Sequence, residues 1–178
     1  MLFRSAGANA GENGVVAVFE QRPPRLRNPA LEKLIHAGRV SVVEPGSTCL
    51  EVDEIAQLVV LEVERINATR VIIDSLSGLE MMLSASGRAR FRPSLALLLE
   101  AMASLGVTLM MTAEMEDRHS FLPLSPERTA FLADGILVQR YVEVGSRLLR
   151  MLVVAKLRGS WHSNELRQYH IDENGVQL

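Results

Sequence analysis

The sequence lacks three features that would each assign it to a particular class of protein. Its one cysteine, Cys49, cannot form an internal disulfide, which excludes a disulfide-stapled fold and leads us to expect a reducing cytoplasm. Its apolar runs, such as residues 107–111, are far shorter than the roughly 20 residues of a membrane-spanning helix. Its net charge of −2 offers no basic field for nucleic acid. We therefore expect neither a membrane nor a nucleic acid as a partner.

What is present is an ordinary globular composition. The 178 residues are 48% hydrophobic and 22% charged, and we expect a single domain over residues 1–178. Residues 1–5, Met-Leu-Phe-Arg-Ser, read as translated adapter DNA, and residues 7–14 read as the end of a helix. We therefore expect the natural protein to continue upstream of residue 7, with residues 1–5 as an artefact.

Strand-like apolar runs alternate with helix-like segments through residue 112. The expected strands are 15–19, 39–44, 70–74 and 107–112, and the expected helices are 29–37, 52–66 and 93–105. Such alternation favours an α/β fold with a mostly parallel sheet covered on both faces. Three further strands without helices between them, 135–144, 147–157 and 165–171, predict an antiparallel extension with hairpin turns at 145–146 and 174–175.

The segment 84–92 is interpreted as a mobile loop. It carries the cationic cluster Arg88, Arg90 and Arg92 beside Phe91. The cluster is consistent with a solvated loop or with a pore or partner-binding loop.

Polar residues follow the strands at the edge where an open parallel sheet binds its ligands. Asp74 ends the run Val-Ile-Ile-Asp, the pattern of a Walker B strand, whose carboxylate holds Mg²⁺ on a nucleotide phosphate. A helix cap or a surface acid is the alternative interpretation of Asp74. Glu20 and Thr112 follow two other strands. A second carboxylate such as Glu20 could polarise an attacking water while the first places the metal.

The most specific string in the chain is Lys-Leu-Arg-Gly-Ser-Trp-His-Ser at 156–163. Lys156 and Arg158 are two apart on one strand, so both charges project to the same face and can meet one polyanion. A solvated strand end with a hairpin turn is the alternative for each residue alone.

Five segments together resemble the KaiC family in order and spacing. They are Phe-Glu-Gln at 19–21, Ile-Asp-Ser-Leu-Ser at 73–77, Asp-Gly-Ile-Leu-Val at 134–138, Tyr-Val-Glu at 141–143 and Lys-Leu-Arg-Gly-Ser-Trp-His at 156–162. The likeness runs from about residue 7 to the end and is strongest to the second ATPase repeat of the two-repeat clock proteins. It implies a three-layer RecA-like P-loop NTPase fold that uses ATP and Mg²⁺.

The resemblance also implies roles for individual residues. Glu20 matches the carboxylate that orients the attacking water, and Asp74 matches the Walker B acid. Lys156 and Arg158 match residues that reach the neighbouring subunit's ATP phosphates, the arginine-finger role. Further positions would line the same shared site: Arg150, Leu157, Ser160, Trp161 and His162. A site of this kind implies a homo-oligomeric ring, usually a hexamer, with further protein partners not specified by the sequence.

The chain departs from the family in several places. No Gly-x4-Gly-Lys-Ser/Thr occurs in it, so the first strand and the phosphate-binding loop are expected upstream. Gln21 stands where the family commonly has a second Glu, and the helix between Pro24 and Arg39 is shorter. Ala130-Phe131 occupy the usual phosphosite positions, which argues against clock-type phosphorylation.

Three functions are compatible with these features. The first is an ATP-binding and ATP-hydrolysing ring domain, of which residues 1–178 alone would be inactive because the phosphate-binding loop is not among them. The second is a nucleotide-dead assembly or regulatory module that keeps the fold and the interface. The third is a recombinase paralogue acting on DNA, which the acidic balance disfavours and for which only residues 88–92 could serve as a basic loop.

Overall fold

The computed structural model describes residues 10–19, 29–45, 51–114, 130–172 and 175–178. Contacts between Cα atoms divide the described residues into two compact units, one before and one after the segment 115–129. The first unit contains one sheet, and the second contains a three-stranded and a two-stranded sheet. Our expectation of a single domain therefore stays a prediction.

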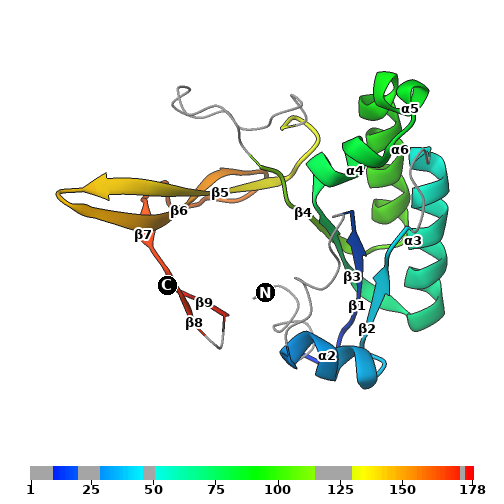
Figure 1. Cartoon of the computed structure of the whole chain (residues 1–178), viewed down its shortest axis with the longest axis horizontal. Helices are drawn as coiled ribbons and strands as arrows, with labels where there is room; N and C mark the ends of the chain where they lie inside the picture. The colour runs from blue at the N-terminus through cyan, green and yellow to red at the C-terminus, as the bar shows by residue number, and fades with distance from the viewer. Residues whose placement is uncertain (1–9, 20–28, 46–50, 115–129, 173–174) are drawn as a thin grey trace. The chain divides into compact units, whose positions relative to one another are not determined.

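The first unit contains a four-stranded parallel sheet in the order β2-β1-β3-β4 (Figure 1). The strands are β1 (Asn13–Val18), β2 (Val40–Val43), β3 (Ala68–Asp74) and β4 (Thr108–Met111). The central strand β1 pairs with β2 on one side and β3 on the other, and its last four residues are buried. The predicted parallel sheet is therefore confirmed, with each strand within two residues of its expected bounds.

Helices cover both faces of this sheet. The helices α3 (Val52–Ile66) and α6 (Phe91–Ser104) lie side by side on one face, where α3 contacts β1, β2 and β3 (Figure 1). On the opposite face, α2 (Pro29–His36) packs Leu31 into a cluster of sheet side chains. Because successive strand residues point to opposite faces, the continuous apolar run of β1 supplies both cores. The cluster on the α2 side consists of Val16, Val18, Leu31, Val40 and Ile72.

Directly after β3, the chain enters the short helix α4 (Leu76–Met82). Ser75 is buried and caps this helix, because its Oγ accepts a hydrogen bond from the backbone N–H of Gly78. Gly78 lies so close to the end of β1 that a Cβ atom there would stand 2.7 Å from the Phe19 carbonyl oxygen. The contact between α4 and β1 therefore requires glycine at this position.

The expectation of a loop at 84–92 is wrong. The structure has a helical turn, α5 (Ala85–Ala89), followed by α6, which begins at Phe91. Ser84 caps α5 by accepting from the N–H of Gly87, and the Arg88 guanidinium donates to the Leu83 carbonyl.

Glu51, distant in sequence, stabilises this same segment. It accepts hydrogen bonds from the hydroxyls of Ser84 and Ser86, and it pairs with Arg90 at 3.5 Å. The hydroxyl hydrogen bonds, that from Ser84 first, lower the pKa of the Glu51 carboxyl. This tie between the start of α3 and the segment 84–90 explains why a stretch of small and basic residues is ordered here.

The second unit is antiparallel, as expected. A long hairpin of β5 (Gly135–Val144) and β6 (Arg147–Leu157) turns at Gly145, whose φ is 62°. The short strand β7 (Arg167–Gln168) adds to β6, and β8 (His170–Asp172) pairs with β9 (Gly175–Gln177). The single strand expected at 165–171 is thus two shorter strands.

None of the helices in the described parts of the chain combines the length and the apolar character that a membrane span requires.

Replacing Gly78 with alanine should destabilise the protein. The added Cβ would meet the main chain of Phe19 at 2.7 and 3.1 Å, and main chain cannot move aside as a flexible side chain can. We expect a net loss of up to about 2 kcal/mol, because overpacking costs about 1–3 kcal/mol and alanine gains roughly 1 kcal/mol in helix propensity. Chemical denaturation of both proteins measures the difference.

Gly14→Ala is the matched control, since its Cβ would meet its nearest neighbour, the Arg70 carbonyl oxygen, at an ordinary 3.5 Å. Equal stability of Gly78→Ala and Gly14→Ala would contradict the close approach of α4 to β1.

Candidate functional site

The carboxyl ends of three strands in the first unit are joined by backbone hydrogen bonds. The Phe19 N–H donates to the Asp74 carbonyl at 3.0 Å, and the Thr112 N–H donates to the Ile73 carbonyl at 3.0 Å. The Leu76 N–H in turn donates to the Thr112 carbonyl at 2.8 Å. The ends of β1, β3 and β4 therefore form one edge, which is where the sequence predicts the nucleotide.

Asp74 is partly exposed at this edge, and its side chain is oriented by Thr112. The Thr112 hydroxyl donates to Asp74 Oδ1 at 2.6 Å. The peptide bond between Asp74 and Ser75 is cis, and Ser75, not Asp74, caps α4. The interpretation of Asp74 as a helix cap is therefore wrong, whereas a carboxylate held at the ligand edge of the sheet agrees with the Walker B pattern.

Glu20 lies outside the described residues. The residue before it, Phe19, is buried and anchored by its hydrogen bond to Asp74. Among the described residues, no group of three or more His, Cys, Asp and Glu side chains could hold a metal ion.

The basic candidates all belong to the second unit. Lys156 lies in β6, and its ammonium group donates to the carbonyls of Ala130 at 2.8 Å and Ala133 at 2.6 Å. Arg158 follows the end of β6, and its Nη2 donates to the Phe131 carbonyl at 2.6 Å. Both cations therefore contact one segment, 130–134, as two charges projecting to the same side would.

Asp134 is the second partner of Arg158. The Arg158 N–H donates to the Asp134 carbonyl at 2.8 Å, and Nη1 lies 3.4 Å from the carboxylate. The arginine side chain remains 54% exposed, so solvent screens this ion pair and most of the guanidinium stays accessible to an anion. Sequence reasoning missed the segment 130–134 as a partner, because main-chain carbonyls carry no residue-type signature.

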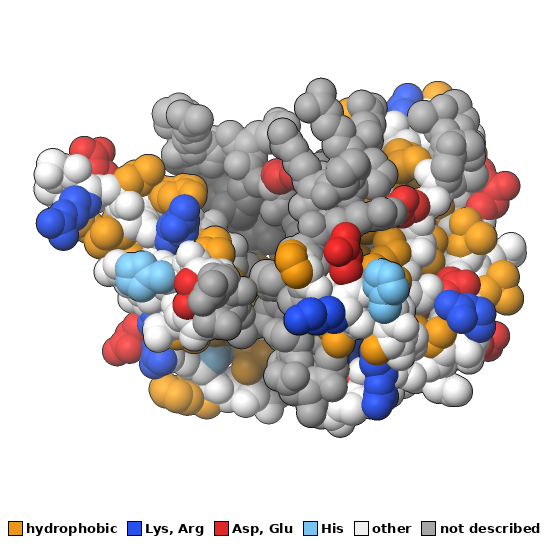
Figure 2. All heavy atoms as spheres, turned by 60° about the horizontal axis from the view of Figure 1, so that its bottom comes forward, with side chains coloured by type: hydrophobic (Ala, Val, Ile, Leu, Met, Phe, Trp, Pro, Cys, Tyr) orange, Lys and Arg blue, Asp and Glu red, His pale blue; other side chains and the backbone are white. Residues whose placement is uncertain are grey.

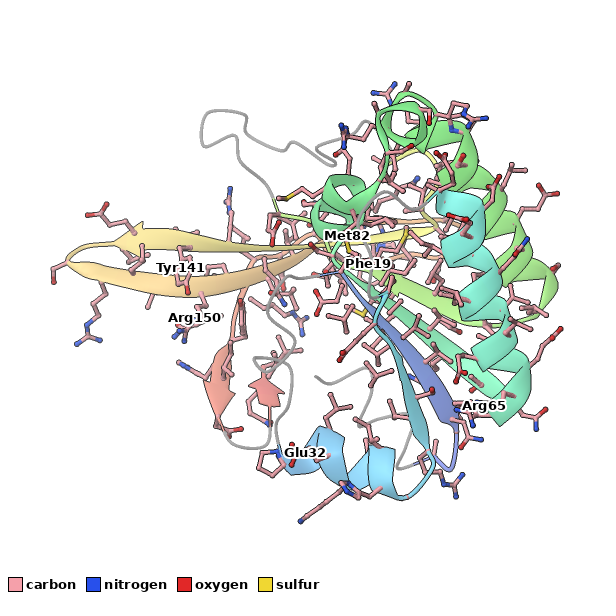
Figure 3. The ribbon with its side chains drawn as sticks, turned by 45° about the vertical axis from the view of Figure 1, so that its right-hand side comes forward. Phe19, Glu32, Arg65, Met82, Tyr141 and Arg150 are labelled. Atoms are coloured by element: carbon pink, nitrogen blue, oxygen red, sulfur yellow. The ribbon has the colours of Figure 1, made fainter. Side chains whose placement is uncertain are left out.

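Arg150 stands opposite Tyr141 across the hairpin (Figure 3). Its Nε donates to the Tyr141 hydroxyl at 3.3 Å, and its guanidinium carbon lies 5.7 Å from the ring centroid. The hydrogen bond to Tyr141 raises the pKa of Arg150 above its already high ordinary value. Arg150 is therefore a permanent cation with a defined aromatic neighbour. The hairpin register contained the signal for this pair, since counting back from the turn sets Tyr141 against Arg150.

The remaining candidates lie on the same strand and on the segment after it. Leu157 is 41% exposed and Trp161 is 88% exposed. The Ser160 hydroxyl donates to the Trp161 carbonyl at 3.4 Å, and His162 is half-buried. An indole this exposed has no packing role within the described part of its own unit.

Comparison with known proteins connects both units to one family. A model of the KaiC-type ATPase family matches residues 1–178. The circadian clock oscillator proteins KaiC of Thermostichus vulcanus and of a Nostoc species are 27% and 26% identical to the chain over 99% of its length. The chain spans about a third of the length of these curated relatives, 35% and 34%.

A solved structure gives the same result for the fold. The crystal structure of a KaiC-like protein from the hyperthermophilic archaeon Pyrococcus horikoshii matches with a TM-score of 0.82 at 27% identity. The match covers 98% of this chain and 79% of that one. The RecA-like α/β fold with its antiparallel extension is therefore confirmed, as is the resemblance seen in the sequence. The chain belongs to the KaiC family of ATPases.

Proposed function

We propose that the chain is part of an ATP-binding and ATP-hydrolysing domain that works in an oligomeric ring. The observation that carries the proposal is the position of Asp74, a carboxylate oriented by Thr112 at the carboxyl edge of a parallel sheet in a chain of an ATPase family. Glu20 is the proposed water-orienting carboxylate, Asp74 the metal acid, and Lys156 and Arg158 the cations that act on a neighbouring subunit's nucleotide.

The residues present fit a magnesium ion. Mg²⁺ binds through one or two carboxylates, keeps several waters and takes its remaining oxygens from the nucleotide phosphates. Asp74 presents one such carboxylate, and the hydrogen bond from the Thr112 hydroxyl to Oδ1 orients it. The bound ion would neutralise charge on the phosphates, whereas orienting the water requires a separate carboxylate, the role proposed for Glu20.

The charges of the second unit support a role toward a phosphate. Lys156 uses two of its three ammonium protons on carbonyls, and Arg158 keeps part of its five-donor fork exposed. Their carbonyl partners are neutral and hold the cations in place, and the one carboxylate beside them, Asp134, forms a solvent-screened ion pair with Arg158 at 3.4 Å. A site completed by a neighbour's cations needs a head-to-tail interface, and such an interface forms a ring when its rotation closes on itself.

The DNA-recombinase alternative has less support. On the face shown in Figure 2, basic and acidic side chains of the described residues are interspersed. In the segment 84–90, Arg88 donates to a main-chain carbonyl and Arg90 pairs with Glu51. A DNA-binding surface usually gathers uncompensated basic residues in one stripe.

Glu20→Gln and Asp74→Asn should have different effects in the complete protein. Glu20→Gln should slow hydrolysis strongly while ATP still binds, because the charge acts on water in the transition state. Asp74→Asn should weaken Mg²⁺-dependent binding as well as turnover. Equilibrium binding of ATP with and without Mg²⁺, together with turnover, separates the two. Identical losses of affinity and turnover in both variants would contradict this division of roles, and a wild type without turnover would favour the assembly module.

In the complete protein, Thr112→Val should lower the affinity for Mg²⁺ without unfolding the sheet. Valine keeps the shape but removes the hydroxyl that orients Asp74 Oδ1. We expect the Mg²⁺ concentration at half-maximal activity to rise about three- to tenfold, which corresponds to about 0.7–1.4 kcal/mol, the net contribution of a typical hydrogen bond. The control is Thr108→Val, an exposed residue at the start of β4, the strand that Thr112 follows. Indistinguishable Mg²⁺ titrations for the two variants would show that Thr112 does not orient the carboxylate.

In the complete protein, Arg158→Ala should strongly reduce hydrolysis of the ATP that the neighbouring subunit binds. Loss of an arginine finger costs on the order of 10³-fold or more in turnover, while nucleotide should remain bound in the subunit's own phosphate-binding loop. Mixing Arg158→Ala subunits with Glu20→Gln subunits should restore activity, because each interface that joins an intact Glu20 to an intact Arg158 forms a complete site. If subunit exchange is demonstrated independently and activity does not return, the shared site is refuted.

A further inference from the structure

Tyr141 and Arg150 form a directly opposed pair on one face of the β5–β6 hairpin (Figure 3). In an antiparallel pair, opposed side chains are the nearest neighbours across the ladder, so each limits the rotamers of the other. Tyr141 is 60% exposed, and Arg150 is also exposed, so neither is held by burial in a core. Their mutual contact restrains both side chains, and Tyr169 adds a weaker electrostatic interaction with Arg150.

The contact uses only one part of the guanidinium. Nε, the nitrogen nearest the main chain, donates to the Tyr141 hydroxyl at 3.3 Å, while the guanidinium carbon lies 5.7 Å from the ring centroid, within cation–π range. Within the part of the chain that the structure describes, neither terminal nitrogen donates a hydrogen bond. The two terminal nitrogens of the guanidinium are therefore oriented and, among the described residues, have no hydrogen-bond acceptor. Such a pair of nitrogens can bind two oxygens of a phosphate or a carboxylate at once.

Within the described ranges the charge of Arg150 has no counter-ion, which separates it from several other arginines of the chain. Arg65 pairs with Glu62 at 2.7 Å, Arg90 with Glu51 at 3.5 Å and Arg158 with Asp134 at 3.4 Å. Among the described residues, no carboxylate lies within ion-pair distance of Arg150. Its partner Tyr141 instead offers a neutral hydroxyl and a π face, which restrict the side chain without neutralising its charge.

We propose that Tyr141 is a positioning residue, which orients Arg150 so that its terminal nitrogens bind an anionic phosphate group of the nucleotide. The inference rests on the proposed function, in which Arg150 lines a nucleotide site completed by two subunits. Restricting the arginine before the nucleotide arrives lowers the conformational entropy lost on binding. Tyr141 therefore acts through Arg150 and does not itself touch the nucleotide.

The test compares two tyrosine variants of the complete protein with Arg150→Ala. Tyr141→Phe keeps the ring and removes the hydroxyl, and Tyr141→Leu removes both while keeping an apolar strand residue. We expect KM for ATP to rise about twofold to threefold for the first variant and about threefold to tenfold for the second, with kcat nearly unchanged. The decisive measurement is the double variant Tyr141→Leu/Arg150→Ala, whose KM should equal that of Arg150→Ala alone.

Melting temperatures of the variants and a control substitution distinguish a loss of Arg150 positioning from a general loss of protein stability. Val144→Ala changes another exposed β5 residue, close to the turn, and should leave KM unchanged. If Arg150→Ala raises KM but Tyr141→Leu does not, or if the two effects add in the double variant, the positioning role is overturned while the proposed function stands. If Arg150→Ala itself leaves KM unchanged, the assignment of Arg150 to the nucleotide site fails, and the role of Tyr141 fails with it.

Discussion

The parallel pairing of β1 with β2 and β3 is the constraint on which the rest of the first unit depends. A strand with a parallel neighbour on each side and helices over both faces has its main-chain groups paired and its side chains covered, so its central residues are predominantly apolar. Val15 to Val18 satisfy this with at most 4% exposure. Because parallel strands end at the same edge, this pairing also brings Phe19, Asp74 and Thr112 together, where their main-chain hydrogen bonds close the edge of the sheet.

The candidate residues of the two units differ in the sign of their charge. The first unit supplies a carboxylate, Asp74, suited to a metal ion, and the second supplies cations suited to phosphate oxygens. Each group contacts a neutral donor or acceptor, which is a threonine hydroxyl, a main-chain carbonyl or a tyrosine, and Arg158 has the exposed Asp134 carboxylate as a further partner. A neutral partner orients a charged side chain and leaves its charge available to a ligand, whereas a buried counter-ion would cancel it.

Much of the fold follows from local rules that the sequence displays directly. The bounds of α3, β5 and β6 agree with the expected 52–66, 135–144 and 147–157, because apolar periodicity and the Gly145 turn mark them. The segment 84–92 escaped prediction because its order depends on Glu51, more than thirty residues earlier, and on serine caps hidden in a stretch resembling a loop.

The candidate site also has features that the sequence predicts and features that it does not. Asp74 and the pair Lys156 and Arg158 could be selected from residue type and strand position, and the resemblance added Arg150 and Trp161. The contacts that these residues make within the chain could not be predicted from the sequence. A register irregularity between Ile136 and Leu137 shifts the pairing of β6 just before Lys156, and such a shift has no reliable signature in the residues themselves.

The use of main-chain carbonyls to hold Lys156 and Arg158 has a consequence for how this segment tolerates change. A carbonyl group is present whatever side chain the residue bears, so Ala130, Phe131 and Ala133 contribute to these contacts through their backbone path and not through their chemical identity. Substitutions that preserve this path would keep both cations in place, while a one-residue deletion would displace them without altering any charged residue. At these three positions, changes of side chain should therefore be tolerated, whereas changes in the number of residues should not.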